Sequence, residues 1–447
     1  MTPANYRVRI RQDGAGDRRL FESASANESA GLRDALTHLL RDEATEVTLA
    51  EMVRETDGPE GVARLFYWLT RLQQAGQLQY SLRLSDASDV QALPQHPGRV
   101  FHDVGFAASK TYVASRFAFI RRDDRDMQLE SPLQPVALRF RSWLPGAVMM
   151  MFGQPASAQS IAERLPAASA TDVVRLVEMF AVTGFIEEPR AVGESAAALW
   201  DFHELLFHAR SSTPRLGRPF AGMNPHRQPE PPPVRPVFSN SEPITLPQPR
   251  LEQWMNEDPP LARVIEHRRS AASAGSNRLT LTHLSDFLYR TAHTQTGQHR
   301  ALPSAGARHE LEWYVAVHDV DALTPGFYHY HAPAHLLHKL RVPGDLVQEM
   351  LGRATAAWSS GDHTPHLLIV VAARFPRMAS RYASIAYRNT LLDAGIAIEA
   401  MYLNATAMRL APCALGINLP DLFARITGLD PFDETPVAMF VLSGSSE

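Results

Sequence analysis

The sequence is poor in cysteine and lacks long apolar runs. Its 447 residues contain one cysteine, Cys413, which excludes an internal disulfide and agrees with a reducing compartment. Since Cys413 lies in the apolar stretch 411–415, we expect it to pack and not to act as a nucleophile or metal ligand. No charged segment followed by an apolar one stands at the start, and no run of about 18 apolar residues occurs, so neither secretion nor a membrane span is expected. A cytoplasmic protein is expected.

An excess of charge of one sign is also missing. The 44 Lys and Arg against 48 Asp and Glu give a net charge of −4, without a block of like charge. Since a protein that binds nucleic acid or an anionic membrane usually shows such a block, we expect neither partner. An apolar fraction of 45% with 21% charged residues is ordinary for a folded protein, and the length allows two or three compact units.

Proline is concentrated between residues 209 and 258, where Pro231, Pro232 and Pro233 stand in a row. Proline fixes φ and removes a hydrogen-bond donor, so this density disfavours both helix and strand. We interpret 209–258 as a semi-rigid connector between an N-terminal half and a C-terminal domain at 259–447.

The N-terminal half shows one pattern twice, first within 1–95. Thr48 and Glu51 form a capping box that opens a helix. A second helix follows, ends at Gly76, and gives way to an alternating strand from Leu78. The apolar stripe of this second helix consists of Val62, Leu65, Phe66, Leu69 and Leu72.

The second copy lies within 112–208. Ser157 caps its first helix, Gly184 closes its second helix, and Ile186 belongs to the short strand that follows. The matching stripe consists of Val173, Leu176, Val177 and Phe180. From cap to glycine the two copies agree in length to within one residue, which predicts a repeated unit.

Two helices followed by a short strand are the profile of a small winged helix, a fold that often binds DNA. The second helices carry few basic residues, with Arg64 and Arg71 in the first copy and Arg175 in the second, which disfavours DNA. The profile resembles the PqqD-like recognition elements of peptide-modifying enzymes, in which a leader peptide adds a strand beside the wing. A purely structural domain remains the alternative.

The C-terminal domain is predicted to be α+β. Strands are expected at 309–319, 327–331 and 436–443, and 366–375 is a nearly unbroken apolar run typical of a strand covered on both faces. Residues 384–410 form a long helix. Its apolar stripe consists of Tyr387, Leu391, Ala394, Ile398, Met401, Ala405 and Met408. Such a helix is expected to pack against the sheet, with a partner subunit as a further possibility.

Eight segments carry a resemblance to a known family. They include RRS at 268–270, PSAGARHELEWYVAV at 303–317 and RYASIAYRNTLLDAG at 381–395. The full set is 116–133, 199–211, 258–270, 281–292, 303–317, 323–331, 381–395 and 426–431. Their order and spacing are similar to those of the SagB-type dehydrogenases, nitroreductase relatives that oxidise thiazole- and oxazole-forming peptides. The resemblance covers nearly the whole chain. It implies a nitroreductase-like FMN-binding C-terminal domain preceded by two winged-helix units.

Three neighbouring residues suit a phosphate group. Arg268 and Arg269 offer two guanidinium groups for bidentate bonds, and Ser270 offers a hydroxyl. Such a triplet alone is usually a solvated turn, but the resemblance implies that these residues bind FMN. Ala272 stands where the family usually has a basic residue, so that contact is missing or comes from another residue such as Arg278.

A loop of small residues is the second candidate for FMN binding. It consists of Pro303, Ser304, Ala305, Gly306 and Ala307. Its backbone can approach a flat ring closely, although the same residues could also form a plain turn. In nitroreductase-like enzymes the matching loop touches the flavin, often from the opposite subunit, which implies an obligate homodimer. The resemblance adds Leu415 and Gly416 as a weaker flavin contact.

Arg381 and Tyr382 bear the chemistry that the resemblance implies. The family commonly has Lys-Tyr here, a pair that takes the substrate Cα proton while a hydride passes to the flavin. A guanidinium is a poor proton acceptor, so Tyr382, or its phenolate held beside Arg381, is the expected base. Arg388 is a further candidate for contact with the cofactor, and both it and Tyr387 could equally pack the start of the long helix.

Four histidines lie close together at 329, 331, 335 and 338. Alternation along a strand would place His329 and His331 on one face. No carboxylate or cysteine at ligand spacing accompanies them, so no metal site is predicted.

The expected function is therefore FMN-dependent oxidation of azolines to azoles in a ribosomally made peptide, with dioxygen reoxidising the flavin. Expected partners are the precursor peptide, a YcaO-type cyclodehydratase that forms the rings first, and a second copy of the chain. Two alternatives stay open. One is a nicotinamide-dependent reductase of a small molecule with the same FMN site. The other is a scaffold that has lost the chemistry, which Ala272 and Arg381 would favour.

Overall fold

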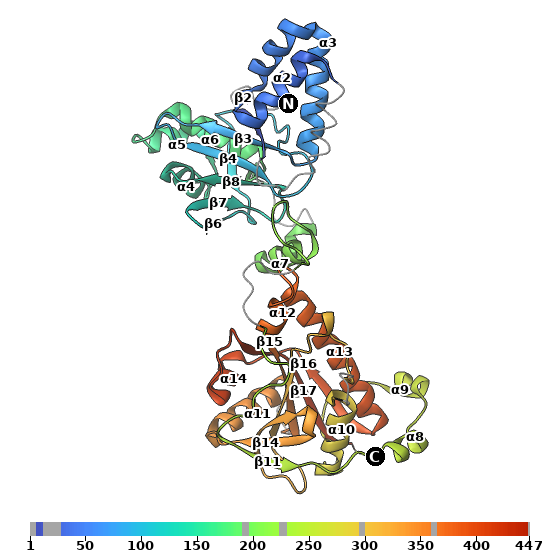
Figure 1. The fold of residues 1–447 in the computed structure, drawn as a ribbon. Coiled ribbons are helices and arrows are strands. Elements are labelled where there is room, and N and C mark those ends of the chain that lie inside the picture. Colours follow the sequence, from blue (N-terminus) through green and yellow to red (C-terminus); the bar gives the residue numbers. More distant parts are fainter. Residues whose placement is uncertain are drawn as a thin grey trace. The chain divides into compact units, whose positions relative to one another are not determined.

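The structure, a computed structural model, describes residues 6–11, 28–189, 196–222, 230–294, 300–358 and 364–445. The chain divides into two compact units, Met1–Phe220 and Ala221–Glu447. Each unit combines helices with sheets, in agreement with the α+β prediction (Figure 1). None of the described helices has both the length and the apolar character that crossing a membrane requires.

Two antiparallel sheets organise the N-terminal unit. The larger has the strand order β2-β1-β3-β4-β8-β7-β6 and the smaller the order β10-β5-β9. The strands are β1 (Arg7–Ile10), β2 (Ala44–Thr45), β3 (Leu78–Arg83), β4 (Asp89–Pro94), β5 (Thr111–Ala114), β6 (Phe119–Asp123), β7 (Asp126–Glu130), β8 (Val136–Phe140), β9 (Ala156–Ser157) and β10 (Ile186–Glu187). The helices are α2 (Ala30–Arg41), α3 (Glu46–Gln74), α4 (Trp143–Met151), α5 (Ala158–Arg164), α6 (Ala170–Val182) and α7 (Phe202–Ser212).

The two copies of the sequence pattern share one order of elements. In each copy one strand lies between two others: β1 between β2 and β3, and β5 between β9 and β10. Left-handed glycines end the second helices where expected, with φ of 69° at Gly76 and 75° at Gly184. Ser157 forms a capping box with Ser160 at the start of α5, so its predicted capping role is confirmed.

The first helix of the first copy begins earlier than predicted. Thr45 and not Thr48 is its N-cap, because the Thr45 side chain accepts the Thr48 backbone N–H at 3.1 Å. Thr48 itself has the helical backbone of the first turn, and a capping residue must stand just outside the helix. The two helices of this copy run on as α3, which kinks at Gly58 (φ 70°) before Pro59.

One hydrophobic core serves both copies. Strand β4 of the first copy pairs with β8 of the second. Leu65 and Leu69 of the first copy and Ile161 and Phe180 of the second belong to the same buried cluster. The sequence predicted separate units at 1–95 and 112–208, whereas the compact unit in the structure contains both copies.

One antiparallel sheet organises the C-terminal unit, with the order β11-β14-β13-β12-β15-β17-β16. Its strands are β11 (Ser241–Thr245), β12 (Leu311–Val317), β13 (Gly326–His331), β14 (Leu336–Leu340), β15 (Leu367–Arg374), β16 (Leu410–Leu415) and β17 (Glu434–Gly444). The helices are α8 (Leu251–Glu257), α9 (Leu261–His267), α10 (Leu281–Ala292), α11 (Gly344–Trp358), α12 (Phe375–Ala379), α13 (Ala386–Ala407) and α14 (Pro420–Thr427). The four predicted strands are present as β12, β13, β15 and β17, and the predicted long helix is α13.

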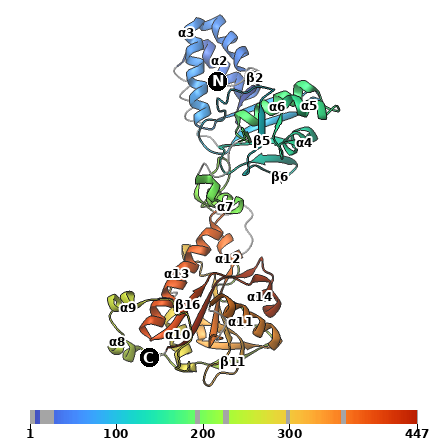
Figure 2. The ribbon, with the colours of Figure 1, turned by 180° about the vertical axis from the view of Figure 1, so that it is seen from behind.

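Helices cover both faces of this sheet (Figures 1 and 2). Adjacent residues of β15 point to opposite faces, as alternation requires. Ile369 packs in the cluster that includes Met401 of α13, and Val370 packs in the cluster that includes Phe423 of α14. All residues of β15 are buried, which explains its unbroken apolar sequence.

The proline-rich segment contains regular structure that the sequence did not predict. Strand β11 and helix α8 both lie within 209–258, and α7 extends into it as far as Ser212. Pro243 is tolerated in β11 because this strand is the edge of the sheet and pairs on one side only, with β14.

Candidate functional site

Helix α13 contacts the predicted cofactor residues at two places. Tyr402, near its C-terminal end, contacts Ser270, and Asp393, nearer its middle, contacts the loop at 303–307. The two positions are nine residues apart, or roughly 14 Å at a helical rise of about 1.5 Å per residue. The structure thus places the phosphate candidates and the ring candidates of one chain at separate points along the same helix.

Tyr402 gathers the first group of residues. Its hydroxyl lies 2.7 Å from Ser270 Oγ and accepts the Ala414 backbone N–H at 2.8 Å. The Arg268 guanidinium lies 5.2 Å from the centroid of the Tyr402 ring, within cation–π range. Arg268, Ser270 and the end of β16, where Leu415 follows Ala414, therefore meet around one aromatic side chain.

Gly416 follows β16 and is exposed. A Cβ added there would meet nothing within 4 Å, so packing within the chain does not require glycine at this position. Leu415 is partly buried against the core under α11 and α14. The suggested second flavin contact at Leu415 and Gly416 thus stays a prediction.

The guanidinium groups at the end of α9 are poor in counterions. Among the residues that the structure describes, neither Arg268 nor Arg269 has a carboxylate at ion-pair distance, whereas Arg290 of the neighbouring α10 pairs with Asp258. Arg269 lines a cavity of about 910 Å³. The lining also includes the basic Arg263, His267 and Arg409 and the acidic Glu257 and Asp258. Guanidinium groups without an acidic partner beside a cavity with a small excess of basic groups fit a phosphate.

The loop at 303–307, called loop 303–307 below, has an unusual backbone. Gly306 has φ of 60°, and the left-handed region continues at Ala307 (54°) and His309 (50°). This conformation is costly for residues with a side chain, and it persists where the surrounding contacts impose it, often at functional sites.

Tyr382 meets this loop at Gly306. A Cβ built on Gly306 would lie 2.5 Å from the Tyr382 hydroxyl, closer than real contacts allow, so the approach requires glycine. Tyr382 is placed by the end of α12, since its N–H donates to Met378 O at 3.0 Å. The predicted base and the predicted flavin loop are therefore in contact. Arg381 is exposed, and Arg388 is exposed in the first turn of α13.

Two buried carboxyl groups lie beside the loop. Glu310 is fully buried and Asp393 is 4% exposed, and the two side chains are close enough for the charge of Asp393 to act on Glu310. Burial, reinforced by the negative charge of Asp393, raises the pKa of Glu310 to about 7.

Sequence reasoning missed Tyr402, Asp393 and Glu310. A signal existed for Asp393, because a carboxylate between Leu392 and Ala394 of an apolar helix is seldom buried without a partner. The sequence signal for a buried carboxyl group was weaker at Glu310, because this residue stands between the loop and the start of an apolar strand. Tyr402 has no sequence feature that separates it from its apolar neighbours.

The clustered histidines make contacts within the fold. His329 is 1% exposed, with Nε2 at 3.0 Å from Glu312 Oε2. His335 lies 2.8 Å from both Ser285 Oγ and the Tyr330 hydroxyl. Across the described ranges, no group of three or more His, Cys, Asp or Glu side chains is arranged to hold a metal ion.

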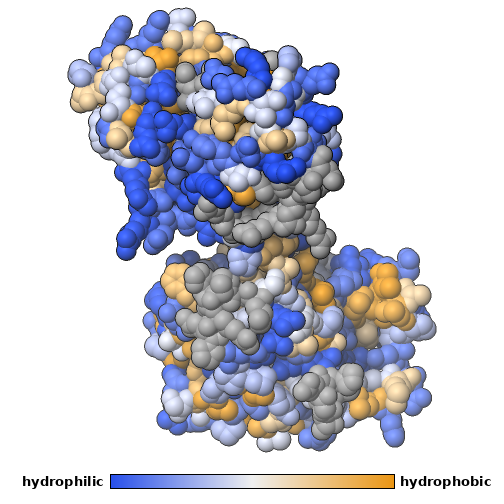
Figure 3. All heavy atoms as spheres, turned by 45° about the horizontal axis from the view of Figure 1, so that its top comes forward, coloured by the Kyte–Doolittle hydropathy of each residue, from blue (hydrophilic) through white to orange (hydrophobic). Residues whose placement is uncertain are grey.

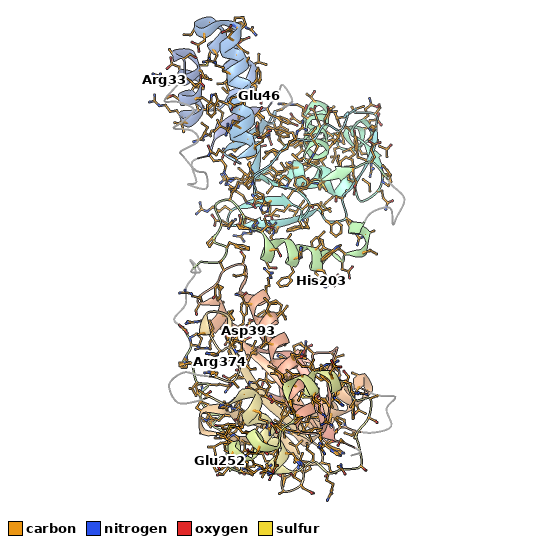
Figure 4. The ribbon with its side chains drawn as sticks, turned by 90° about the vertical axis from the view of Figure 1, so that its right-hand side faces the viewer. Arg33, Glu46, His203, Glu252, Arg374 and Asp393 are labelled. Carbon is orange, nitrogen blue, oxygen red and sulfur yellow. The ribbon has the colours of Figure 1, made fainter. Side chains whose placement is uncertain are left out.

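The N-terminal unit has a groove of about 760 Å³ along α3, called the α3 groove below. Both segments of the kinked helix line it, with Val47 from the first and Phe66 from the second, together with Tyr80 of β3 and Phe101. Its charged lining residues are Glu46 (labelled in Figure 4), Glu51, Arg54 and Arg99. An apolar groove with a few charged groups fits a short peptide segment.

Strand β3 itself offers no free edge. It lies between β1 and β4, and both partners are hydrogen-bonded to it. A peptide therefore cannot extend the sheet beside β3, the wing strand of the first copy. The wing strand of the second copy, β10, pairs with β5 and lies at the edge of the smaller sheet in the described part of the chain. The α3 groove provides a different surface, in which side chains and not a strand ladder would make the contacts.

Two family models match separate parts of the chain. The model described as cyanobactin oxidase ThcOx matches residues 112–217, and the model of the nitroreductase family matches residues 265–444. The first match lies in the N-terminal unit and includes the second copy of the repeat. The second includes loop 303–307, Tyr382 and the whole of α13. Together they confirm the resemblance to a SagB-type dehydrogenase, in which a nitroreductase domain follows a domain of a peptide-tailoring oxidase.

Individual proteins show the same two relationships. A Methanocaldococcus jannaschii protein named as a nitroreductase, MJ1384, is 30% identical over 170 residues, which cover 38% of this chain and 81% of that protein. The trifolitoxin-processing protein TfxB of Rhizobium leguminosarum bv. trifolii is 28% identical over 158 residues, or 33% of this chain and 40% of that protein. Among solved structures, the E. coli microcin synthetase McbBCD complex is similar at 17% identity and a TM-score of 0.34, over 46% of this chain and 83% of that one.

Proposed function

This chain belongs to the nitroreductase family, and we propose that it is an FMN-dependent dehydrogenase that oxidises azoline rings in a ribosomally made peptide to azoles. The observation that carries the proposal is the contact of the Tyr382 hydroxyl with Gly306 in loop 303–307. A side chain able to take a proton lies against the loop proposed to touch a flavin ring. The names of two matches, a cyanobactin oxidase and a trifolitoxin-processing protein, support a peptide as the substrate.

Residues at the end of α9 would hold the cofactor phosphate. Arg268 and Arg269 have no acidic partner among the described residues, and Ser270 lies beside them with its hydroxyl on Tyr402. Charge-assisted hydrogen bonds from guanidinium groups are the strong contacts that a phosphate requires. Loop 303–307 and Arg388 would contact the ring. Bound FMN would accept the hydride of the substrate.

Tyr382 would act as the base. In the proposed step its phenolate oxygen takes the Cα proton of the azoline as the hydride leaves, so that the ring loses two hydrogens and becomes aromatic. Arg381 cannot take the proton, because a guanidinium stays protonated. It would stabilise the negative charge that develops on the substrate. Dioxygen would reoxidise the reduced cofactor.

A homodimer would complete the site. Several large apolar side chains of α13 and of the α8–α9 segment are exposed, and Figure 3 shows apolar atoms gathered on the C-terminal unit where α8 and α9 lie. They are Tyr387, Leu391, Leu392 and Ile396 on α13, and Leu251, Met255, Leu261 and Ile265 on α8 and α9. Apolar patches of this kind mark interfaces. A second copy would bring its loop 303–307 to the phosphate candidates of the first, which contact α13 nine residues away from the position that contacts the loop of their own chain.

The α3 groove would bind the precursor peptide. It combines apolar side chains with charges of both signs, which supports peptide binding in this half of the chain. A YcaO-type cyclodehydratase would form the azolines beforehand and is the proposed enzyme partner.

One experiment tests the proposal. The purified protein should be yellow, release FMN on denaturation, and remove the mass of two hydrogens for each ring when it is given an azoline peptide and dioxygen. A colourless protein that does not bind added FMN would favour the scaffold alternative. A yellow protein that leaves azolines unchanged but oxidises a nicotinamide with a small acceptor would favour the small-molecule reductase.

A further inference from the structure

Glu310 and Asp393 are neighbouring buried carboxyl groups. Glu310 Oε2 accepts a hydrogen bond from Ser304, but Glu310 Oε1 has no hydrogen-bond partner among the described residues. An ionised carboxylate that is buried beside a second carboxyl group is costly, so the protonated form of Glu310 is favoured. Up to about pH 7, Glu310 therefore keeps its proton.

This pair anchors the N-terminal side of the strained loop, and Ser304 links that side to His309 beyond the loop. Asp393 accepts the Ala305 backbone N–H at 3.0 and 3.3 Å. Glu310 accepts the Ser304 hydroxyl at 3.1 Å, and Ser304 Oγ in turn accepts the His309 N–H at 2.9 Å. Gly306, which touches Tyr382, lies between the anchored residues. The left-handed backbone of the loop needs such contacts to persist.

We propose that the Glu310–Asp393 pair is a positioning element: while Glu310 is protonated, the pair holds loop 303–307 against Tyr382, and ionisation of Glu310 loosens the loop and weakens flavin binding. The inference rests on the proposed function, because it takes this loop to contact FMN. Neither residue touches the reacting atoms, so both act through the position of the loop.

The neighbouring Arg374 does not neutralise the negative charge of the pair. Burial raises the pKa of Glu310 to about 7, and Asp393 contributes in the same direction, while the hydrogen bond from Ser304 opposes the shift. Arg374, labelled with Asp393 in Figure 4, adds a backbone N–H to Glu310 O at 2.9 Å at the end of β15. The Arg374 guanidinium is directed to Glu312 at 3.4 Å and so does not neutralise the pair.

Nearby His309 does not change charge in the same range. Burial lowers its pKa to about 4, and the positive charges of Arg300, Arg377 and Arg308 contribute in the same direction. His309 is therefore neutral wherever the carboxyl pair gains or loses its proton. A pH effect between about 5 and 8 can be assigned to the pair.

The sign of the effect follows from the raised pKa of Glu310. In the unfolded chain this carboxyl ionises near its ordinary pKa, so the folded chain holds an additional proton from there up to about pH 7. The stability that this proton provides is present at low pH and is lost as the pH rises through 7. Wild-type protein without FMN should therefore melt at a lower temperature at pH 8 than at pH 5, by about a few degrees.

Isosteric amides test the pair. In Glu310→Gln the side chain is neutral at every pH and its oxygen can still accept from Ser304, and Asp393→Asn offers the same exchange. The matched control is Glu399→Gln, which removes an exposed carboxylate of the same helix. The readouts are the melting temperature of the apoprotein and the Kd for FMN, each measured between pH 5 and 8 with the full chain.

In wild type and Glu399→Gln, FMN binding should weaken roughly fivefold or more over this range, which corresponds to a modest coupling between two sites. In the amide variants both the melting temperature and the Kd should vary much less. The same pH profile of the Kd in wild type and both amide variants would overturn the inference, even if their melting profiles differ. If one variant fails to fold, the other decides. Absence of FMN binding by wild type at every pH would instead contradict the proposed function.

Discussion

Tyr382 is the residue on which the proposed chemistry depends most, and replacing it by Phe separates its hydroxyl from its ring. Tyr382→Phe keeps the ring that packs beside Gly306, so the fold and FMN binding should persist. Turnover should fall by about 10²- to 10⁴-fold, the usual contribution of a general base. The measurement is azole formation by mass spectrometry. Tyr387→Phe, which removes a hydroxyl from the first turn of α13, is the control and should stay active. A wild-type rate in Tyr382→Phe would leave the hydroxyl without a chemical role.

Arg381 allows a second test of the same step. If its charge stabilises the developing anion, Arg381→Lys should stay active, because it keeps the charge and restores the pair common in SagB-type dehydrogenases. Arg381→Ala should lose roughly 10-fold or more in kcat, the equivalent of about 1.4 kcal/mol in the barrier. Steady-state kinetics with an azoline peptide decides this. Equal kcat in the Ala and wild-type proteins would show that the charge of Arg381 does not contribute to the reaction.

Single residues show where sequence reasoning reached its limit. The sequence predicted a base at Tyr382 and a flavin contact at loop 303–307, and the structure brings the two into contact. It did not predict Glu310 and Asp393, because their interaction depends on a strand start and a helix face that are 83 residues apart. A carboxyl in an apolar sequence signals a need for a partner but does not identify the partner.

Helices and strands were predictable where burial alone decides them. Residues 367–373 of β15 are all apolar because both faces of the strand are covered, and α13 was recognised from its stripe. Two features depended on something else. By residue type, Thr45 and Thr48 suit the N-cap almost equally well, and the local backbone angles decide that Thr45 is the cap. Strand β11 exists because it pairs with β14, nearly 100 residues later.

Helix α7 is attached to the larger sheet of its unit through Glu130 at the end of β7. This carboxylate is 1% exposed and forms ion pairs with Arg121 at 2.7 Å, with Arg210 of α7, and with Arg215 at 3.5 Å. In Glu130→Gln the three guanidinium groups lose their shared counterion. We expect a loss of about 2 to 4 kcal/mol in the free energy of unfolding, toward the lower end because the arginines are partly exposed.

Urea unfolding of the full chain measures this loss. Glu188→Gln is the matched control, since it removes the exposed partner of Lys110, and exposed pairs contribute about 0 to 1 kcal/mol. Equal stability of the two variants would show that α7 does not depend on the charge of Glu130.

At the scale of the whole molecule, the proposed function has the cofactor held between two copies of the chain. Arg268→Ala with Arg269→Ala should release FMN, because each charge-assisted bond to phosphate contributes about 1.5 to 3 kcal/mol, and two together about 10²-fold or more in Kd. The dimer should remain, since these residues are not part of the exposed apolar sets on α13 and α8–α9. Flavin absorbance and light scattering of the purified protein check both points. Arg353→Ala, an exposed arginine of α11, serves as the control. Full flavin content in the double variant would mean that the phosphate binds elsewhere.

The two units also divide the proposed work, and the α3 groove provides the test of that division. Phe66 lines the groove and is 42% exposed, so Phe66→Asp places a charge on its apolar wall without opening the core. Binding of the precursor peptide by the full chain should weaken about 10-fold or more, the effect of losing about 1.4 kcal/mol of apolar contact. Oxidation of a short azoline compound that lacks the leader should stay unchanged, because the flavin site lies in the other unit. Met150→Asp, an equally polar change at an exposed position of α4 outside the groove, should leave both activities intact.

Duplex DNA should not bind with the steep salt dependence that phosphate contacts produce. Equal peptide affinity of Phe66→Asp and Met150→Asp would show that the peptide binds another surface of the chain. Tight, salt-sensitive binding of duplex DNA would overturn peptide recognition as the role of the N-terminal unit.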